Sequence, residues 1–192
     1  MKKMIEIERK YIVDDKVAKK LIDRSKKKIG IVQWYLRNEK NEIERVRLQI
    51  ILKNNELIKK WNYAYKANTN IPHEKIEKEK KYIPKNINEL FNKEMIIKVR
   101  YIIKENPEIV LDEFIELDDL KYNIDEKYLL EIEMKDIKKY TKNDFINILK
   151  EENIEVLSDV TEDYRYYNNN IANKKKNKGL NEIIEVLKWR IS

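Results

Sequence analysis

The chain has 192 residues and no cysteine, which excludes disulfides and thiolate metal sites. A chain of this length is most simply one domain that can bury roughly two thirds of its unfolded surface. The formal charge is +7, but 42 basic residues stand beside 35 acidic ones, so the sum alone does not indicate nucleic acid as a partner. The sequence shows neither a leader pattern nor a long apolar run, and we expect a cytoplasmic protein with no membrane partner.

The first predicted elements are a strand at residues 4–13 (MIEIERKYIV) and a helix in DDKVAKKLIDRSKKKIG. Apolar residues recur at helical spacing in the second segment, with Asp14 as the expected N-cap and Gly30 as the expected end of the helix.

Seven later segments are short, rich in Ile, Val and Tyr, and bounded by polar or proline-containing clusters, which predicts strands. They are IVQWYLRN, EIERVRLQII, LIKKWNYAYKAN, HEKIEKEKKY, EMIIKVRYIIK, PEIVLDEFIEL and KYLLEIEMK. With the first strand they make about eight, the number at which a sheet can close on itself.

Two helices are predicted near the end of the chain. The first lies in KNDFINILKEENI, with Thr141 or Asn143 as its cap, and the second is LNEIIEVLKWRI. Between them, IANKKKNKG is expected to be a basic, flexible connector. We therefore expect one domain over 1–192, with the sheet and its covering helices in 1–172 and the connector and C-terminal helix in 173–192.

The polar faces of the predicted strands carry charges of both signs, because successive side chains of a strand point to opposite faces. They are Glu6, Glu8 and Lys10; Arg45 and Arg47; Lys66; Lys75, Glu77 and Glu79; Lys98 and Arg100; Asp112; and Glu131 and Glu133. Any one such pair is most simply a solvated outer face. Their recurrence on separate strands, opposite apolar faces, favours a charged bore inside the sheet.

Such a bore suits a metal and a polyphosphate together. Clustered carboxylates raise one another's pKa unless a cation lies between them, and hard oxygen ligands favour Mg²⁺ or Mn²⁺ over zinc. Clustered Arg and Lys are neutralised by phosphate groups through charge-assisted hydrogen bonds.

The ordered set EIERK, QWYL, ERVR, YK, EKEK, KVR, VLDEF and LLEIEM resembles the CYTH superfamily, the triphosphate tunnel metalloenzymes. DVTEDYRYYNNNIA is similar to the ending of bacterial members, so the resemblance covers residues 1 to about 172. It implies an α+β, mainly β fold: an eight-stranded antiparallel closed β-barrel with helices packed outside. Family members are often dimers, which makes a homodimer possible.

The resemblance also implies roles for the charged residues. The metal ligands would be Glu6, Glu8, Glu131 and Glu133. The triphosphate would be bound by Lys10, Arg45, Arg47, Lys66, Lys75, Lys98 and Arg100. Glu77, Glu79 and Asp112 would hold a second metal or orient the attacking water. Lys75 departs from the family's usual arginine and would grip a phosphate less firmly.

The leading expectation is metal-dependent hydrolysis of inorganic tripolyphosphate to pyrophosphate and phosphate. The same tunnel could instead act on thiamine triphosphate or a nucleotide, or as a class IV adenylate cyclase. A non-catalytic polyphosphate- or nucleotide-binding module is the alternative of another class. Nucleic acid is not expected as a partner.

Overall fold

The computed structural model describes residues 2–39, 42–68, 74–135 and 141–192, except for the side chains of residues 2–5, 74 and 75. Its long strands are β1 (Lys2–Ile12), β2 (Lys27–Asn38), β3 (Glu42–Lys53), β4 (Glu56–Asn68), β5 (Glu74–Lys81), β6 (Glu94–Glu105), β7 (Glu108–Phe114) and β8 (Tyr128–Lys135). Two short strands are β9 (Ser158–Asp159) and β10 (Asn173–Lys174). The helices are α1 (Asp15–Asp23), α2 (Ile87–Leu90), α3 (Lys142–Glu151), α4 (Asn168–Ile171) and α5 (Leu180–Ile191), with a 3₁₀ turn η1 (Tyr164–Tyr166).

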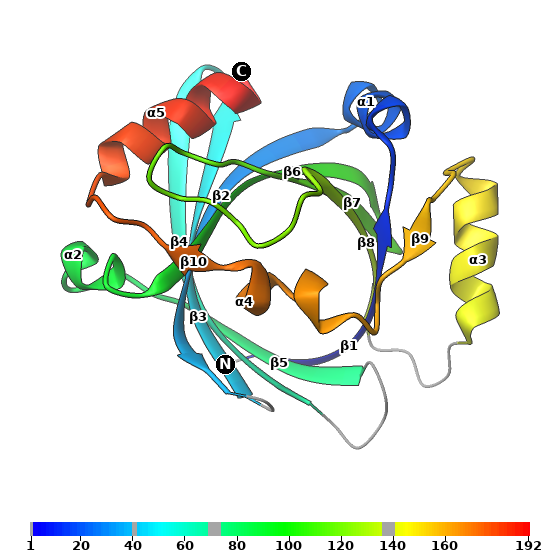
Figure 1. Cartoon of the computed structure of the whole chain (residues 1–192), viewed down its shortest axis with the longest axis horizontal. Coiled ribbons are helices and arrows are strands. Elements are labelled where there is room, and N and C mark those ends of the chain that lie inside the picture. Colours follow the sequence, from blue (N-terminus) through cyan, green and yellow to red (C-terminus); the bar gives the residue numbers. More distant parts are fainter. Residues whose placement is uncertain (1, 40–41, 69–73, 136–140) are drawn as a thin grey trace.

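All strands belong to one antiparallel sheet that curls strongly around its interior (Figure 1). The long strands pair in the order β6-β2-β3-β4-β5-β1-β8-β7, and β7 also pairs with β6. The expected mainly β, α+β fold is thus confirmed. The expected count of eight strands is not confirmed: within the described residues the sheet has 10, because the short strands β9 and β10 add to β1 and β6.

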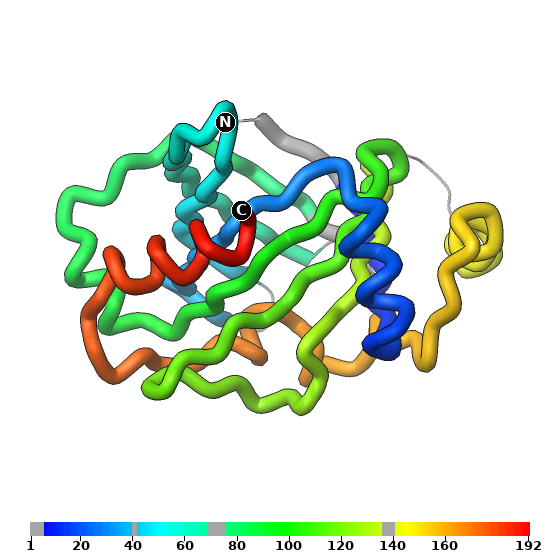
Figure 2. The backbone as a smooth tube through the Cα atoms, turned by 90° about the horizontal axis from the view of Figure 1, so that it is seen from above, coloured from blue at the N-terminus to red at the C-terminus, as the bar shows by residue number. Residues whose placement is uncertain are grey.

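The hydrophobic core lies between the outer face of the sheet and the helices that cover it. Leu21 of α1, Phe145 of α3 and Leu187 of α5 belong to the same buried cluster as Trp34 and Val99 of the sheet. In Figures 1 and 2 these three helices lie around the outside of the curled sheet. Because apolar side chains point outward to the helices, strand alternation turns the charged ones inward.

Asp14 caps α1 as predicted, since its side chain accepts a hydrogen bond from the backbone of Val17 at 2.7 Å. Gly30, however, does not end this helix. The helix ends at Asp23, and Gly30 lies in β2, where an added Cβ would be 3.0 Å from Cβ of Leu187. A glycine is therefore needed here for the close approach of α5 to the sheet.

The expected flexible connector is instead anchored at Lys175, which is only 4% exposed. Its Nζ donates to both carboxylate oxygens of Asp119, at 2.8 and 2.7 Å, and to the carbonyl of Asn177 at 3.0 Å. The backbone N–H of Asn177 donates to the same carboxylate. A buried, fully bonded ammonium fixes this segment against the loop that follows β7.

Candidate active site

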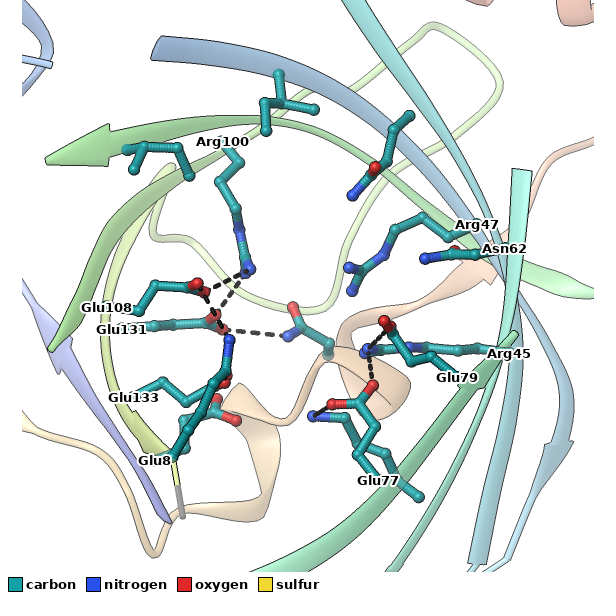
Figure 3. Close-up of a pocket in the computed structure, with 16 residues that line it drawn as sticks. Glu8, Arg45, Arg47, Asn62, Glu77, Glu79, Arg100, Glu108, Glu131 and Glu133 are labelled. Carbon is teal, nitrogen blue, oxygen red and sulfur yellow. Dashed lines mark hydrogen bonds and ion pairs between the residues drawn. The ribbon is translucent and has the colours of Figure 1, made fainter. Parts of the chain in front are cut away.

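The sheet encloses a cavity of about 220 Å³ with a strongly charged lining (Figure 3). Among the described residues, six carboxylates and five cations face it. The carboxylates are Glu8, Glu77, Glu79, Glu108, Glu131 and Glu133, and the cations are Arg45, Arg47, Lys66, Arg100 and Lys135. The two signs are only partly segregated. Figure 3 shows Glu8, Glu108, Glu131 and Glu133 on one side with Arg100 reaching toward them, and Arg45 and Arg47 on the other side with Glu77 and Glu79.

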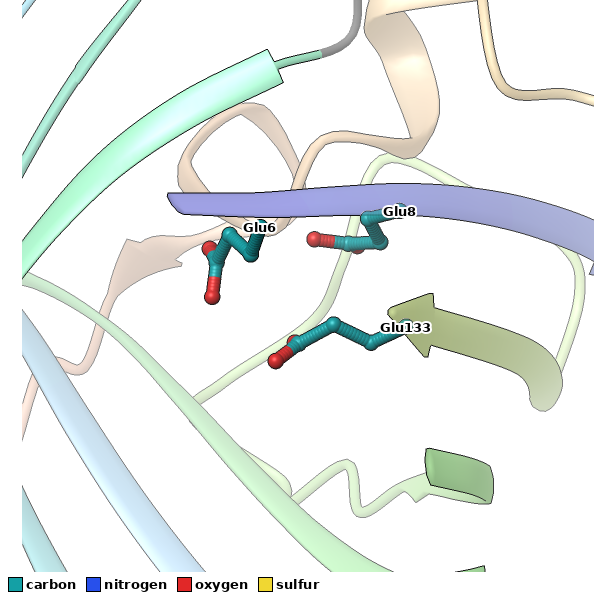
Figure 4. A group of neighbouring side chains, drawn as sticks. All are labelled: Glu6, Glu8 and Glu133. Atoms are coloured by element: carbon teal, nitrogen blue, oxygen red, sulfur yellow. The ribbon is translucent and has the colours of Figure 1, made fainter. Parts of the chain in front are cut away.

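Three of the four predicted metal ligands lie together on the acidic side. Glu8 and Glu133 are direct partners in the β1–β8 register, and Glu6 is the next inward residue on β1. One carboxylate oxygen from each of the three lies within 4.8 Å of the others (Figure 4). This arrangement offers three hard oxygen donors at one point.

Glu6 is almost fully buried, at 1% exposed, and the hydrogen bonding of its carboxyl group is incomplete. One carboxylate oxygen accepts a hydrogen bond from Lys66, whereas Oε2 has no partner among the described residues. Burial, together with the neighbouring carboxylates of Glu133 and Glu77, raises the pKa of Glu6 to about 8 despite Lys66. A cation beside Oε2 would supply the missing interaction.

Glu131, the fourth predicted ligand, is not part of this trio. It is paired with Lys10 in the β1–β8 register and forms an ion pair with that lysine. Its other oxygen lies 2.5 Å from Nη2 of Arg100. Although burial favours the protonated form, Lys10 and Arg100 hold the pKa of Glu131 well below its ordinary value. Lys10, predicted to face phosphate, also lies 2.5 Å from Glu8.

On the opposite side, Arg45 and Lys66 share one carboxylate. Their distances to Glu77 are 2.6 and 3.2 Å. Burial again favours the neutral acid, but these two cations hold the pKa of Glu77 below its ordinary value. Glu79 is more open, with a side chain that is 35% exposed and 3.8 Å from Arg45.

Arg47 is a buried cation whose described hydrogen-bond partner is a neutral amide. Its Nε donates to the Gln33 side chain at 2.9 Å, but in the described part of the chain it forms no ion pair with a carboxylate. Burial and the neighbouring guanidinium groups of Arg45 and Arg100 lower the pKa of Arg47 to about 10. The side chain remains charged at neutral pH, so an anion in the cavity would find it available.

Lys98, Arg100 and Asp112 form a buried group on β6 and β7. Arg100 and Asp112 are opposite each other in the register, and two guanidinium nitrogens contact the carboxylate at 2.7 Å each. Lys98 and Asp112 are 0% exposed and form an ion pair. Burial lowers the pKa of Lys98 to about 8 although Asp112 opposes the shift. Arg100 lines the cavity described above, whereas Lys98 and Asp112 do not. Asp112 therefore contacts the cavity only through Arg100.

Lys75 lies opposite Glu6 in the β1–β5 register, but its side chain is outside the described residues. The roles predicted for all these residues stay predictions, since their positions alone do not test them. Sequence reasoning gave no role to Gln33 or Glu108, whereas Asn168, with Tyr166 and Tyr167, matches the closing motif of the resemblance and was expected to support the tunnel wall rather than to bind substrate. Strand alternation could have placed the first two inside the sheet, whereas Asn168 belongs to α4 and has no strand pattern to reveal it.

Comparison with known proteins adds evidence on the fold. No protein-family model and no curated protein matches the chain. Among solved structures, the PH1819 protein of Pyrococcus horikoshii OT3 matches with a TM-score of 0.53 and 18% identity over 79% of this chain and 92% of that one. The chain shares its fold with solved structures. A conserved hypothetical protein of Pyrococcus furiosus matches with a TM-score of 0.53 and 14% sequence identity, over 78% of this chain and 91% of that one.

A third structure is that of a "putative adenylate cyclase (bh2851)" from Bacillus halodurans, with a TM-score of 0.52 and 18% identity over 82% of this chain and 95% of that one. At such identities the likeness concerns the fold alone. In the described residues, no helix combines the length and apolar character that crossing a bilayer requires.

Proposed function

We propose that the protein is a CYTH-type triphosphate tunnel enzyme that hydrolyses inorganic tripolyphosphate to pyrophosphate and phosphate with Mg²⁺ or Mn²⁺. The observation that carries this proposal is that one interior contains both a buried cation and a buried carboxyl group whose interactions are incomplete. Arg47 lacks a carboxylate partner in the described residues, and Glu6 Oε2 lacks a hydrogen bond there. An anion and a cation bound together would satisfy both.

The proposed tunnel is the interior of the eight long strands. Pairing of β6 with β2 on one side and with β7 on the other supports a barrel around the charged cavity. The likeness to a structure whose name is "putative adenylate cyclase", a CYTH-family activity, is consistent with this tunnel.

The residues present fit a hard divalent cation. Glu6, Glu8 and Glu133 would hold it through one carboxylate oxygen each, leaving positions for water and phosphate oxygens. When bound, the ion neutralises charge on the phosphate oxygens and on the departing pyrophosphate. A module that only sequestered polyphosphate would gain nothing from three clustered carboxylates.

The chain's own residues would then bind and orient the substrate. Arg45, Arg47 and Arg100 present guanidinium groups to the cavity and would donate charge-assisted hydrogen bonds to successive phosphates. Glu79 lines the same cavity and is the most open of the predicted catalytic carboxylates. It would accept a hydrogen bond from the attacking water, while the bond from the terminal phosphorus to the bridging oxygen breaks.

The cavity lining favours an inorganic substrate over a nucleotide. Among the described residues its apolar lining consists of Ile29 and Ile102, and none of them presents an aromatic ring to stack on a base. An adenylate cyclase would also need to activate a ribose hydroxyl beside such a base site.

The test is a panel of tripolyphosphate, ATP and thiamine triphosphate, each with Mg²⁺ or Mn²⁺, with products identified by phosphorus NMR. We expect pyrophosphate and phosphate from tripolyphosphate at the highest kcat/KM. Cyclic AMP from ATP would show a cyclase, and tight binding of tripolyphosphate without turnover would show a binding module. Phosphate release that survives a chelator would contradict the metal-dependent mechanism.

A further inference from the structure

A second, smaller cavity lies next to the large one inside the sheet. It measures about 40 Å³ and is lined by cations and hydroxyl or amide groups as well as by Glu8. Its cations are Lys10, Arg45 and Lys66, and its other polar groups come from Tyr35, Tyr167, Asn168 and Asn169. Of the strand residues, Arg45, Lys66 and Glu8 border both cavities.

The register shows that the two cavities follow each other along the interior. On β3, Ile43 and Arg45 border the small cavity, whereas Arg45, Arg47 and Gln49 border the large one. On β2 the same order holds, with Tyr35 at the small cavity and Ile29 at the large one. A linear molecule passing along the interior would therefore meet them in sequence.

Asn168 is the one residue bordering both cavities, among those described, that does not belong to a strand. It is the first residue of α4, in the segment that crosses one opening of the curled sheet (Figure 1). Its Nδ2 donates to Glu131 at 3.1 Å, and its Oδ1 accepts from Lys98 at 3.3 Å. Opposite charges at the two ends of the amide fix its orientation.

We infer that Asn168 is the end stop of the phosphate channel and limits the length of the polyphosphate that the protein accepts. This inference rests on the proposed function. A triphosphate held along Arg45, Arg47 and Arg100 fits the large cavity, and a further phosphate would have to enter the small one. Because Lys10, Lys66 and Arg45 face the small cavity, it has the charge to hold that phosphate once the amide is removed.

The adjoining Asn169 provides a matched control. It borders the small cavity only, and its side chain donates to Asn38 at 2.8 Å rather than to the charged groups of the interior. Asn168→Ala and Asn169→Ala remove the same atoms from neighbouring positions of one short helix. Of the two residues only Asn168 borders both cavities, so we expect only the first change to widen the passage between them.

The experiment is calorimetric titration of wild type and both variants with tripolyphosphate and tetrapolyphosphate, without metal and at low ionic strength. For Asn168→Ala we expect the affinity for tetrapolyphosphate, relative to tripolyphosphate, to rise by about tenfold, the effect of one added charge-assisted hydrogen bond. Asn169→Ala should keep the wild-type ratio. Circular dichroism spectra matching wild type show that a variant is folded.

An unchanged ratio in folded Asn168→Ala, or an equal rise in Asn169→Ala, would overturn the end stop. If wild type binds both polyphosphates but hydrolyses neither with Mg²⁺ or Mn²⁺, the proposed hydrolysis fails, and the binding ratio still decides the role of Asn168. Binding of neither polyphosphate would overturn both proposals.

Discussion

Removing a charged or polar group from water is costly unless a partner compensates it, and the interior of this protein contains a cation and a carboxyl group whose interactions are incomplete. Arg47 is 9% exposed and bonded to a neutral amide, while Glu6 is 1% exposed with one oxygen unsatisfied among the described residues. In contrast, Glu131 and Asp112 are each contacted by two cations. The unsatisfied groups are therefore the ones we expect to respond to ligands.

Replacing Arg47 by Gln should separate binding from stability. Loss of a charge-assisted contact, worth about 1.5–3 kcal/mol, should weaken tripolyphosphate binding roughly 10- to 100-fold. Stability without ligand should stay equal or rise, because burial and Arg45 disfavour the charge of Arg47. Calorimetric titration and urea unfolding measure the two effects. Arg37→Gln, at a side chain that is 43% exposed and paired with Glu39, is the control and should leave binding unchanged.

Glu6 gives a pH-dependent prediction whose sign follows from its pKa, raised from 4.5 to about 8. Between these values the folded state binds more protons than the unfolded one, so the contribution of Glu6 to stability is lost as pH rises toward 8. A metal ion that binds Glu6 must displace the proton of its carboxyl group. The apparent affinity of the site for the metal should therefore fall by about tenfold for each pH unit below 8.

Titration of Mn²⁺ from pH 6 to pH 9, followed by calorimetry, measures this dependence. Affinity should rise with pH and level off above 8, and Glu6→Gln should weaken binding and flatten the profile. A profile in Glu6→Gln as steep as in wild type would assign the titrating group to another residue.

At the scale of elements, the contact between β2 and α5 positions the C-terminal helix. An added Cβ at Gly30 would lie 3.0 Å from Cβ and 3.3 Å from Cδ1 of Leu187, which is fully buried. Leu187 also belongs to the main hydrophobic core. The helix thus completes the covering of the sheet at a point that has no room for a side chain.

We expect Gly30→Ala to lower the free energy of unfolding by about 1–3 kcal/mol through overpacking, and Leu187→Ala to lower it by about 2–5 kcal/mol through a cavity. In the double variant the 3.3 Å contact with Cδ1 is removed and the 3.0 Å contact with Cβ stays, so the combined loss should be smaller than the sum by only part of the overpacking cost. Urea unfolding of the four proteins measures this coupling. Additive losses would show that the two side chains are not in contact.

Strand alternation was enough to predict which residues face inward, but not which of them meet. Glu131 and Glu133 have the same pattern on β8. The β1–β8 register places Glu133 beside Glu8 and Glu131 beside Lys10. Of the two β8 carboxylates, only Glu133 therefore joins Glu6 and Glu8. Register depends on pairing between distant segments, which a local pattern does not contain.

The segment after α3 was harder to predict for the same reason. Asn168 acquires its position because α4 crosses the sheet opening, and this course is fixed by contacts such as Lys175 with Asp119 and Thr161 with the backbone of Lys10. Those partners are far apart in the chain. Composition alone suggested only a solvated, basic stretch around Lys175.

At the scale of the whole molecule, covering the sheet with helices on its outside leaves the inside for charged groups. Trp34 illustrates the outer layer, since it is fully buried and stacks on Trp61 with ring centroids 5.7 Å apart. Inside, the acidic and cationic groups face one cavity. We propose that the interior holds a divalent metal at Glu6, Glu8 and Glu133 and a triphosphate along its arginines.

A crystal structure with tripolyphosphate and Mn²⁺, with anomalous diffraction to locate the metal, tests this claim most directly. The account predicts a manganese peak within coordinating distance of Glu6, Glu8 and Glu133, and phosphate density against Arg45, Arg47 and Arg100. Manganese bound away from these three carboxylates, or polyphosphate bound outside the sheet, would contradict it.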